Sequence, residues 1–425
     1  MFETYLTEFK REWSLIWPPD APIWERRLLT TLFLSLAVVF FLVPAGRFYF
    51  SFLFVKISTG YNAYKLFPFP LAVWLIWRWK RPRRWRIHLP IVFPALLFFL
   101  LSILAAAGSP DAYQAISESL EIAFYIIFSI MLLDLPWSHR AVKWAAGGFV
   151  LGHFYLGLTA LYQLLFSGTP RINATFDHPN ALAAYAPLSL SLLLWIFDRS
   201  QTSKQRTGVL AAIGCVLFGA LFSFSRSAYV GLLIFGFVFY YAYPSAAPKI
   251  PRRAWAIFFA AAILVAASAM TRFSSTIDEL TMKEKISRLT IWPFVMDLCM
   301  PSSPFFGIGL GPVQREAALS IMASAPMELP IATARHPHSL YLDLLISMGI
   351  PGLLSFLWLA YEAFRQTAWD RTIAAAALRA GLAGFLVQEI FDPQLLNGNI
   401  PVALFVLFAL GSYSAIQRQT NIENE

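Results

Sequence analysis

The segment RWKRPRRWRIHLPIVFPALLFFLLSILAAA, residues 78–107, joins a dense basic cluster to a long uncharged apolar run. The apolar part, residues 89–107, has close to the roughly 20 residues that a helix needs to cross a bilayer. The whole chain of 425 residues is 58% hydrophobic and 13% charged, whereas soluble domains have about 45–50% and about 25%. The sequence therefore predicts an all-α polytopic membrane protein and argues against a soluble globular domain.

Similar apolar runs recur along the chain, and we expect about 12 transmembrane helices. The short run at 66–77 contains two prolines and is counted because the distribution of charge requires it. With it, every even-numbered connection carries an excess of Lys and Arg, which is typical of cytoplasmic connections. The expected spans are 28–43, 66–77, 89–107, 116–133, 144–166, 181–197, 208–224, 228–243, 254–270, 340–360, 372–387 and 400–416.

The same charge pattern predicts the topology. Cations precede the first span and no small-residue cleavage site follows it, so we expect an uncleaved anchor and two cytoplasmic termini. Residues 1–425 are expected to form one integral membrane domain, in which residues 271–339 are a long periplasmic segment with helices that lie on the membrane face. Topology also explains most of the net charge of +9, so no nucleic-acid partner is expected.

Cations on the outward side are informative because orientation does not explain them. The guanidinium group of arginine can bind two phosphate oxygens at once, and it stays charged at physiological pH. A histidine with a pKa of about 6.5 can accept a proton from an attacking hydroxyl, which contributes roughly 10²–10⁴-fold to a rate. Together these groups favour transfer from a lipid-linked diphosphate. The outward cations are Arg171, Arg226, Arg288, Arg335, His336 and His338.

Arg226 stands in FSFSRSAY, between two spans so close that only a tight turn separates them. A charge at the hydrocarbon edge must snorkel, pair with another group or face a polar cavity, so a functional role is the first hypothesis. The alternative is an anchor to headgroup phosphate.

For other outward residues, the sequence also allows explanations that do not involve ligand binding. Arg171 opens RINATFDHPNALAAY, where Asp177 or Asn180 could cap the next helix instead of binding a ligand. The HxH pair His336 and His338 lacks a third ligand at a diagnostic spacing, so no zinc site and no cofactor are expected.

These residues resemble the O-antigen ligase and polymerase superfamily of bacterial envelope glycosyltransferases. The matching features are RINATFDHPNALA, the pair Ser225 and Arg226, RLTIWPF followed by PFFGIGLG, and RHPHSLYLDLLISMGIPGLL. They follow the order of the family and cover about half of the chain. The resemblance implies a membrane-embedded, GT-C-like glycosyltransferase fold of twelve helices, with periplasmic helices between spans nine and ten and metal-independent chemistry.

The resemblance also implies roles for single residues. His338 matches the family's essential histidine and is expected to act as general base, with a phosphate-binding cation as its alternative role. Arg226 matches the family's essential arginine after the turn that leads into the eighth helix. Arg288 matches the arginine of the long periplasmic segment, and Arg171 matches the arginine before the sixth helix. His336 and Arg335 are expected to support substrate binding. The family's acidic residue at the end of the eleventh helix corresponds to Glu389 or Asp392 in QEIFDP.

Within the superfamily the expected activity is that of a ligase. It moves O-antigen polysaccharide from undecaprenyl diphosphate to the lipid A-core oligosaccharide at the periplasmic face of the inner membrane. A single large outward segment and a short carboxyl tail favour the ligase over an O-antigen polymerase or a protein O-oligosaccharyltransferase. A transporter of lipid-linked sugars is the alternative from a different class, but its interrupted helix pairs are not evident.

Overall fold

A computed structural model describes residues 22–45, 48–52, 55–59, 66–80, 89–109, 111–135, 139–167, 171–243, 305–311, 339–368 and 372–424 apart from 392, 394 and 396–398. This part of the chain contains eleven helices. They are α2 (Ile23–Ala45), α3 (Pro68–Lys80), α4 (Leu89–Ala107), α5 (Ala112–Asp134), α6 (His139–Phe166), α7 (Pro179–Arg199), α8 (Ser203–Phe222), α9 (Arg226–Ala242), α13 (Leu340–Ala368), α14 (Ile373–Gln388) and α15 (Ile400–Asn424).

The helices confirm the expected fold class. Seven are long and apolar enough to cross a membrane, and α9, α14 and Ile400–Ser412 of α15 are shorter apolar helices. Each of the eleven overlies one expected span, while the ninth expected span, 254–270, lies outside the described residues. Large apolar side chains such as Leu158 and Phe166 are exposed, as on surfaces that meet lipid. The chain is a multi-pass, all-α membrane protein.

A small β-hairpin follows α2 and was not expected from the sequence. Strands β1 (Phe48–Phe52) and β2 (Val55–Thr59) pair antiparallel, with Phe48 opposite Thr59 and Phe52 opposite Val55. A search for spans of about 20 residues passes over strands of this length. The expected periplasmic segment lies largely outside the described residues, apart from 305–311 and Ser339.

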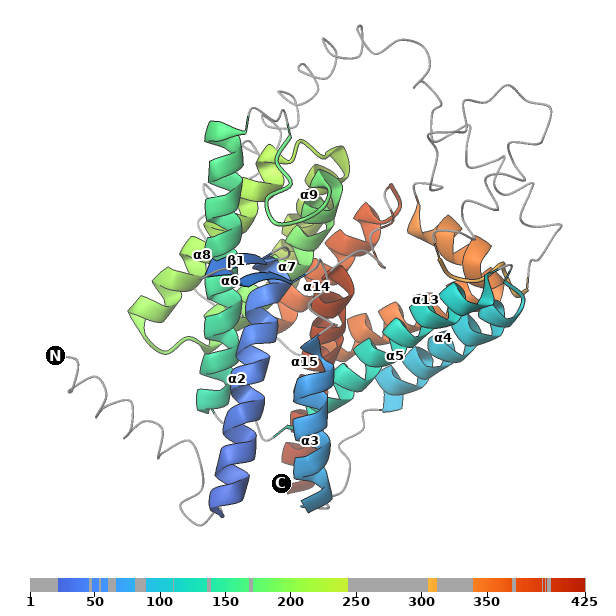
Figure 1. The fold of residues 1–425 in the computed structure, drawn as a ribbon, viewed down its shortest axis with the longest axis horizontal. Helices are drawn as coiled ribbons and strands as arrows, with labels where there is room; N and C mark the ends of the chain where they lie inside the picture. The colour runs from blue at the N-terminus through green and yellow to red at the C-terminus, as the bar shows by residue number, and fades with distance from the viewer. Residues whose placement is uncertain are drawn as a thin grey trace, which may run out of the picture.

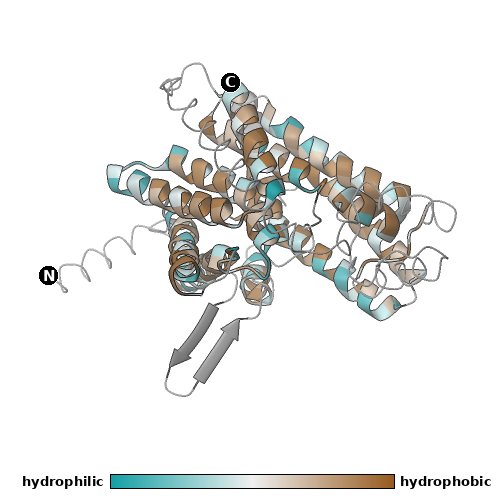
Figure 2. Cartoon of the chain, turned by 90° about the horizontal axis from the view of Figure 1, so that it is seen from above, coloured by the Kyte–Doolittle hydropathy of each residue, from teal (hydrophilic) through white to brown (hydrophobic). Residues whose placement is uncertain are grey.

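The helices form two groups joined by a central pair (Figure 1). Helices α2, α6, α7, α8 and α9 pack together on one side, and α4, α5 and α13 on the other. Helix α14 packs against α7 and α9, and α15 contacts α5, α7 and α13, so these two connect the groups. Figure 2 shows that most helices are apolar along much of their length.

Helix α3, the shortest of the expected spans, is held by buried polar contacts. The Arg78 Nε lies 3.2 Å from Asp134 Oδ2 on α5, and Trp74 Nε1 donates to the same oxygen at 3.0 Å. Trp77 Nε1 donates to Glu25 Oε1 on α2 at 3.2 Å. Buried charges are tolerated when they are paired and hydrogen-bonded. The carboxyl end of α3 is thereby fixed to the start of α2 and the end of α5.

At the other end of α2, side chains bind the carbonyls that its last turn leaves open. Thr175 Oγ1 donates to Pro44 O at 2.7 Å, and Asn399 Nδ2 lies 3.1 Å from Leu42 O and 3.2 Å from Val43 O. We call the end of the bundle that contains the α8–α9 turn the turn end. The opposite end contains the carboxyl terminus of α7 and the start of α8, and we call it the basic end.

Candidate functional site

Arg226 is the first residue of α9 and its side chain is exposed at the turn end. The chain reaches it through Ser223, the C-cap of α8, Phe224, with a φ of 48°, and Ser225, the N-cap of α9. A positive φ is uncommon for a residue other than glycine. The turn is therefore a defined local structure that leaves Arg226 at the surface, as the sequence predicts.

Arg171 holds this turn in place. Its Nε donates to the Ser223 carbonyl at 2.9 Å, and its Nη2 donates to Asn180 Oδ1 on α7 at 2.8 Å. The backbone N–H of Ile172 donates to Phe222 O at 3.1 Å. Arg171 thus links the start of α7 to the end of α8, directly before the residue pair that leads to Arg226.

Two further hydroxyl groups fix the same turn. Tyr229, one turn into α9, donates its phenolic hydrogen to Leu221 O at 2.8 Å. Ser223 Oγ donates to Ala220 O at 2.7 Å and accepts from Ser225 N at 3.3 Å. The carbonyls at the end of α8 are therefore bound by side chains of the surrounding segments, which makes the position of Arg226 a consequence of tertiary contacts.

The segment that carries Arg171 is anchored by Gln163 of α6. Its Oε1 accepts from Asn173 N at 3.2 Å and from Ala174 N at 2.8 Å, and its Nε2 donates to Ala174 O at 3.0 Å. Ala174 has a φ of 48°. Gln163 does not stand out in the sequence because a single polar residue near a span end is common.

The cap of α7 differs from the expectation. His178 is the N-cap, and its Nδ1 accepts from Asn180 N at 3.2 Å. The side-chain oxygen of Asn180 instead accepts a hydrogen bond from Arg171. The proposal that Asp177 or Asn180 caps this helix was wrong, because the asparagine oxygen is engaged by the guanidinium.

Glu389 lies at the end of α14 and is buried, with 0% of its surface exposed. Its backbone carbonyl accepts from Leu340 N at 2.8 Å, and its side-chain Oε2 accepts from Leu395 N at 3.1 Å. Tyr341 Oη donates to Leu386 O at 2.7 Å. The end of α14 therefore binds the first turn of α13, which directly follows His338 and Ser339 in the sequence.

The neighbouring Gln388 joins α14 to α7. In the amide orientation that satisfies its neighbours, it donates to Ala183 O at 3.1 Å and accepts from Ala184 N at 2.7 Å. Pro187 lacks the N–H that would otherwise bond the Ala183 carbonyl, so the glutamine occupies the gap left by the proline. A Cβ on Gly231 of α9 would lie 3.0 Å from the side-chain amide of Gln388. The close approach of α7, α9 and α14 depends on this small residue.

Two motifs that lie far apart in the sequence meet at the bend of α13. Gly349 interrupts the helix with a φ of 67°, and Pro351 follows it. Ile308 N donates to Ile346 O and Gly309 N donates to Ser347 O, both at 2.9 Å. The proline removes the helical partner of the Ser347 carbonyl, and the FGIGLG segment supplies a replacement donor. The two motifs are therefore one structural unit.

Several expected site residues fall outside the described part of the chain. They are Arg288, Arg335, His336, His338 and Asp392. Among the residues that the structure describes, Arg171 and Arg226 are brought to one turn, and Glu389 adjoins the start of α13. No group of three His, Cys, Asp or Glu side chains in the described ranges is arranged to hold a metal ion.

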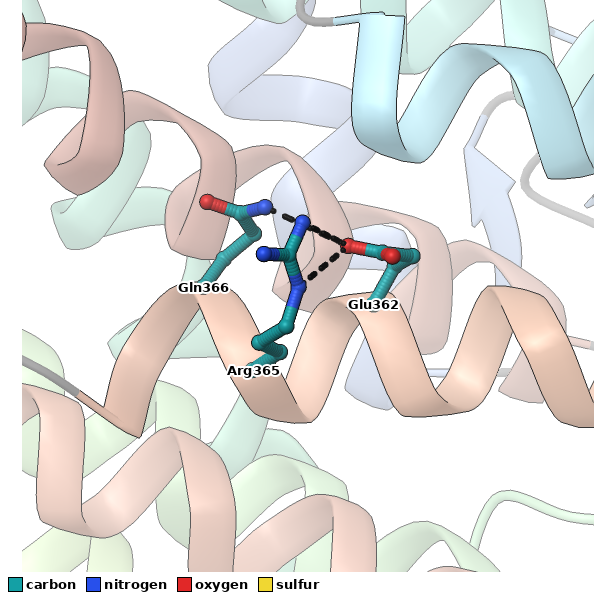
Figure 3. Close-up of polar contacts among 3 residues, drawn as sticks. All are labelled: Glu362, Arg365 and Gln366. Carbon is teal, nitrogen blue, oxygen red and sulfur yellow. Dashed lines mark hydrogen bonds and ion pairs between the residues drawn. The ribbon is translucent and has the colours of Figure 1, made fainter.

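Charges near the far end of α13 belong to a local ion pair. Glu362 Oε2 accepts from Arg365 Nε at 2.9 Å and Nη2 at 2.7 Å, and Gln366 Nε2 lies 3.4 Å from it (Figure 3). These residues lie at the carboxyl end of the helix whose amino end adjoins Glu389. These hydrogen bonds join residues within one turn of α13.

Comparison with known families gives a match over about a third of the chain. A family model described as O-antigen ligase matches residues 210–357, from within α8 to the bend of α13. The match includes Arg226, Arg288, His338 and both motifs that meet at Gly349. No curated protein matches the chain. Residues 210–357 are therefore similar to the O-antigen ligase family, and they lie within a multi-pass membrane protein.

Proposed function

We propose that this protein is an O-antigen ligase of the bacterial inner membrane. It transfers O-antigen polysaccharide from undecaprenyl diphosphate to the lipid A-core oligosaccharide at the periplasmic face. The observation that carries the proposal is the O-antigen ligase match over residues 210–357, which contains the turn that exposes Arg226. The expected orientation, with both termini cytoplasmic, puts the turn end on the periplasmic side.

In this proposal Arg226 and Arg288 bind the diphosphate of the donor. A guanidinium matches two phosphate oxygens at once and keeps its charge while the diphosphate leaves. Arg226 suits this role because it is exposed at a helix start, where backbone N–H groups also favour an anion. Arg171 contributes positive charge and acts as a positioning residue, since its Nε and Nη2 hold the turn.

His338 is the proposed general base. It removes the proton of the acceptor hydroxyl as the oxygen attacks the anomeric carbon and the bond to the diphosphate breaks, so a single displacement inverts the anomeric centre. Arg335 and His336 assist substrate binding. The end of α14 supports this step, because the Glu389 carbonyl accepts from Leu340 N and thereby fixes the chain two residues after His338.

Deletion of the gene in its host tests the proposal. A ligase deletion removes the lipopolysaccharide ladder from a gel while long polymer accumulates on the lipid carrier. A product with a single repeat unit on the core would instead identify a polymerase. An unchanged lipopolysaccharide with a loss of glycosylated protein would identify a protein O-oligosaccharyltransferase.

The role of His338 needs a reconstituted transfer assay with separate measurement of donor binding. If His338→Ala and His338→Arg both abolish transfer while donor binding persists, the histidine acts as the base. If His338→Arg retains transfer, positive charge suffices and the base assignment is wrong.

A further inference from the structure

The basic end of the bundle contains a large cavity away from the turn that exposes Arg226. Its volume is about 610 Å³, within the range of about 300–1,000 Å³ of small-molecule sites. The carboxyl-terminal parts of α5 and α7, the amino-terminal halves of α6 and α8, and parts of α2 and α15 form its walls. The interior is apolar, with Leu133, Phe149, Leu192 and Val406 among the lining residues. A cavity of this kind between membrane helices suits a hydrocarbon chain.

The lining is polar and positively charged where the helices end. Lys143 near the start of α6 and Arg199 at the end of α7 both line the cavity, together with Gln205 in the first turn of α8. No acidic side chain is among the described residues that line it. The charge of the site is therefore complementary to an anionic headgroup.

Trp195 provides an independent observation that indicates ligand binding. Its side chain lines the cavity and is 8% exposed, yet its Nε1–H has no acceptor among the residues that the structure describes. A buried donor without an acceptor is unfavourable. The Arg199 guanidinium lies over the same indole, with Cζ 4.0 Å from the ring centroid. The ring thus holds a cation beside its own N–H, and both groups favour an oxyanion.

We propose that this cavity binds an anionic phospholipid. An acyl chain occupies the apolar interior, and the phosphodiester lies between Lys143 and Arg199 with Trp195 Nε1–H as a donor to one of its oxygens. Basic pockets between transmembrane helices bind anionic lipid headgroups in this way. The site is separate from the proposed donor site, because the two occupy opposite ends of α7 and α8. A polyprenyl phosphate has the same chemistry of tail and head, so the experiment must distinguish the two lipids.

The first experiment measures lipid binding to the full chain by native mass spectrometry in detergent. Phosphatidylglycerol, phosphatidylcholine and undecaprenyl phosphate are added separately to the wild type and to Lys143→Gln/Arg199→Gln. We expect tight binding of phosphatidylglycerol alone and a loss of about tenfold or more in the double variant. Lys204→Gln is the matched control, since Lys204 is exposed at the same end and outside the lining.

Two outcomes would overturn the assignment. Equal binding of phosphatidylglycerol and phosphatidylcholine, or wild-type binding by the double variant, would remove the anionic headgroup from the site. Tighter binding of undecaprenyl phosphate than of phosphatidylglycerol would assign the cavity to a polyprenyl lipid instead.

A second pair of variants tests the cavity itself. Gly208 lines the cavity and Gly214 on the same helix does not, and a Cβ added at either glycine meets no atom within 4 Å. Gly208→Phe should therefore fold, fill part of the cavity and lose phosphatidylglycerol, whereas Gly214→Phe should bind it as the wild type does. Retained binding in Gly208→Phe, with thermal unfolding matched to that of Gly214→Phe, would contradict the proposal.

Discussion

The two ends of the bundle use arginine in opposite ways. At the turn end, Arg171 donates to the Ser223 carbonyl and to Asn180, so its guanidinium fixes the backbone. At the basic end, Arg199 lies over the Trp195 ring beside an apolar cavity. Directional hydrogen bonds define one geometry, while stacking on a ring holds a charge and leaves space next to it. The turn end is thus built to position a residue, and the basic end is built to receive a ligand.

The largest change in transfer rate is expected at Arg226, and a cation of the basic end serves as the comparison. Arg226→Ala and Arg226→Lys should lower the transfer rate by roughly 10²-fold or more, because a lysine keeps the charge but loses the bidentate fork. Lys204→Gln at the basic end should leave the rate unchanged. The measurement is transfer by purified enzyme in reconstituted membranes. Full activity in both Arg226 variants would remove this residue from the site.

The bend of α13 tests how strongly the fold depends on backbone geometry at a single glycine. Gly349→Ala should lower the free energy of unfolding by at least about 1–3 kcal/mol, because its φ of 67° is strained for alanine. The new Cβ would also lie 2.5 Å from the Phe305 backbone. Gly214→Ala, in open space on a helix, should instead raise stability by roughly 0.5–1 kcal/mol. Thermal unfolding in detergent compares the two, and equal midpoints would contradict the requirement for glycine at the bend.

A matched pair of arginines compares the two ends directly. Arg171→Ala leaves the Ser223 carbonyl and Asn180 without this donor, which should cost about 1–3 kcal/mol and reduce transfer through displacement of Arg226. Arg206 Nε also donates to a backbone carbonyl, that of Ser200 at 3.2 Å, but its side chain is exposed at the basic end. Arg206→Ala should therefore have a smaller effect on stability and none on transfer. If both variants lose transfer equally, Arg171 has no specific positioning role.

The smallest effect is expected for the ion pair of α13 shown in Figure 3. The Arg365 side chain is 46% exposed, and pairs of this kind contribute roughly 0.3–0.5 kcal/mol. Arg365→Ala should shift thermal unfolding only slightly, with a smaller shift at high salt. A loss as large as that of Arg171→Ala would show that Glu362, which is largely buried, depends on the arginine for solvation.

Much of the fold could be predicted because bilayer thickness sets the length of a spanning helix. The expected span 89–107 and helix α4 have the same bounds, and the short run at 66–77 corresponds to α3. The charge pattern alone required that helix. Its buried contacts to Glu25 and Asp134 could not be predicted, because the sequence does not specify which helices are neighbours.

The sequence identified candidate residues of the turn end by their type, and it did not predict their contacts. Arg226 at a tight turn and Arg171 before the sixth span were recognisable as charges that the expected topology does not explain. The contact between Arg171 and Ser223 was not predictable, because it joins segments separated by two helices, α7 and α8. The roles of Gln163 and Gln388 were also not predicted. A single glutamine near the end of a span gives no distinctive sequence pattern.

The sequence by itself determined the class of this protein and the positions of the spans that match the eleven described helices. Hydrophobicity and charge act locally along the chain, so these properties need no knowledge of neighbours. The tertiary structure alone decided which carbonyls the side chains bind. It also joined the FGIGLG segment to the bend at Gly349 and left a cavity beside Trp195. Such features depend on helix packing, because a backbone group freed by a proline or a helix end binds whichever donor the fold brings near.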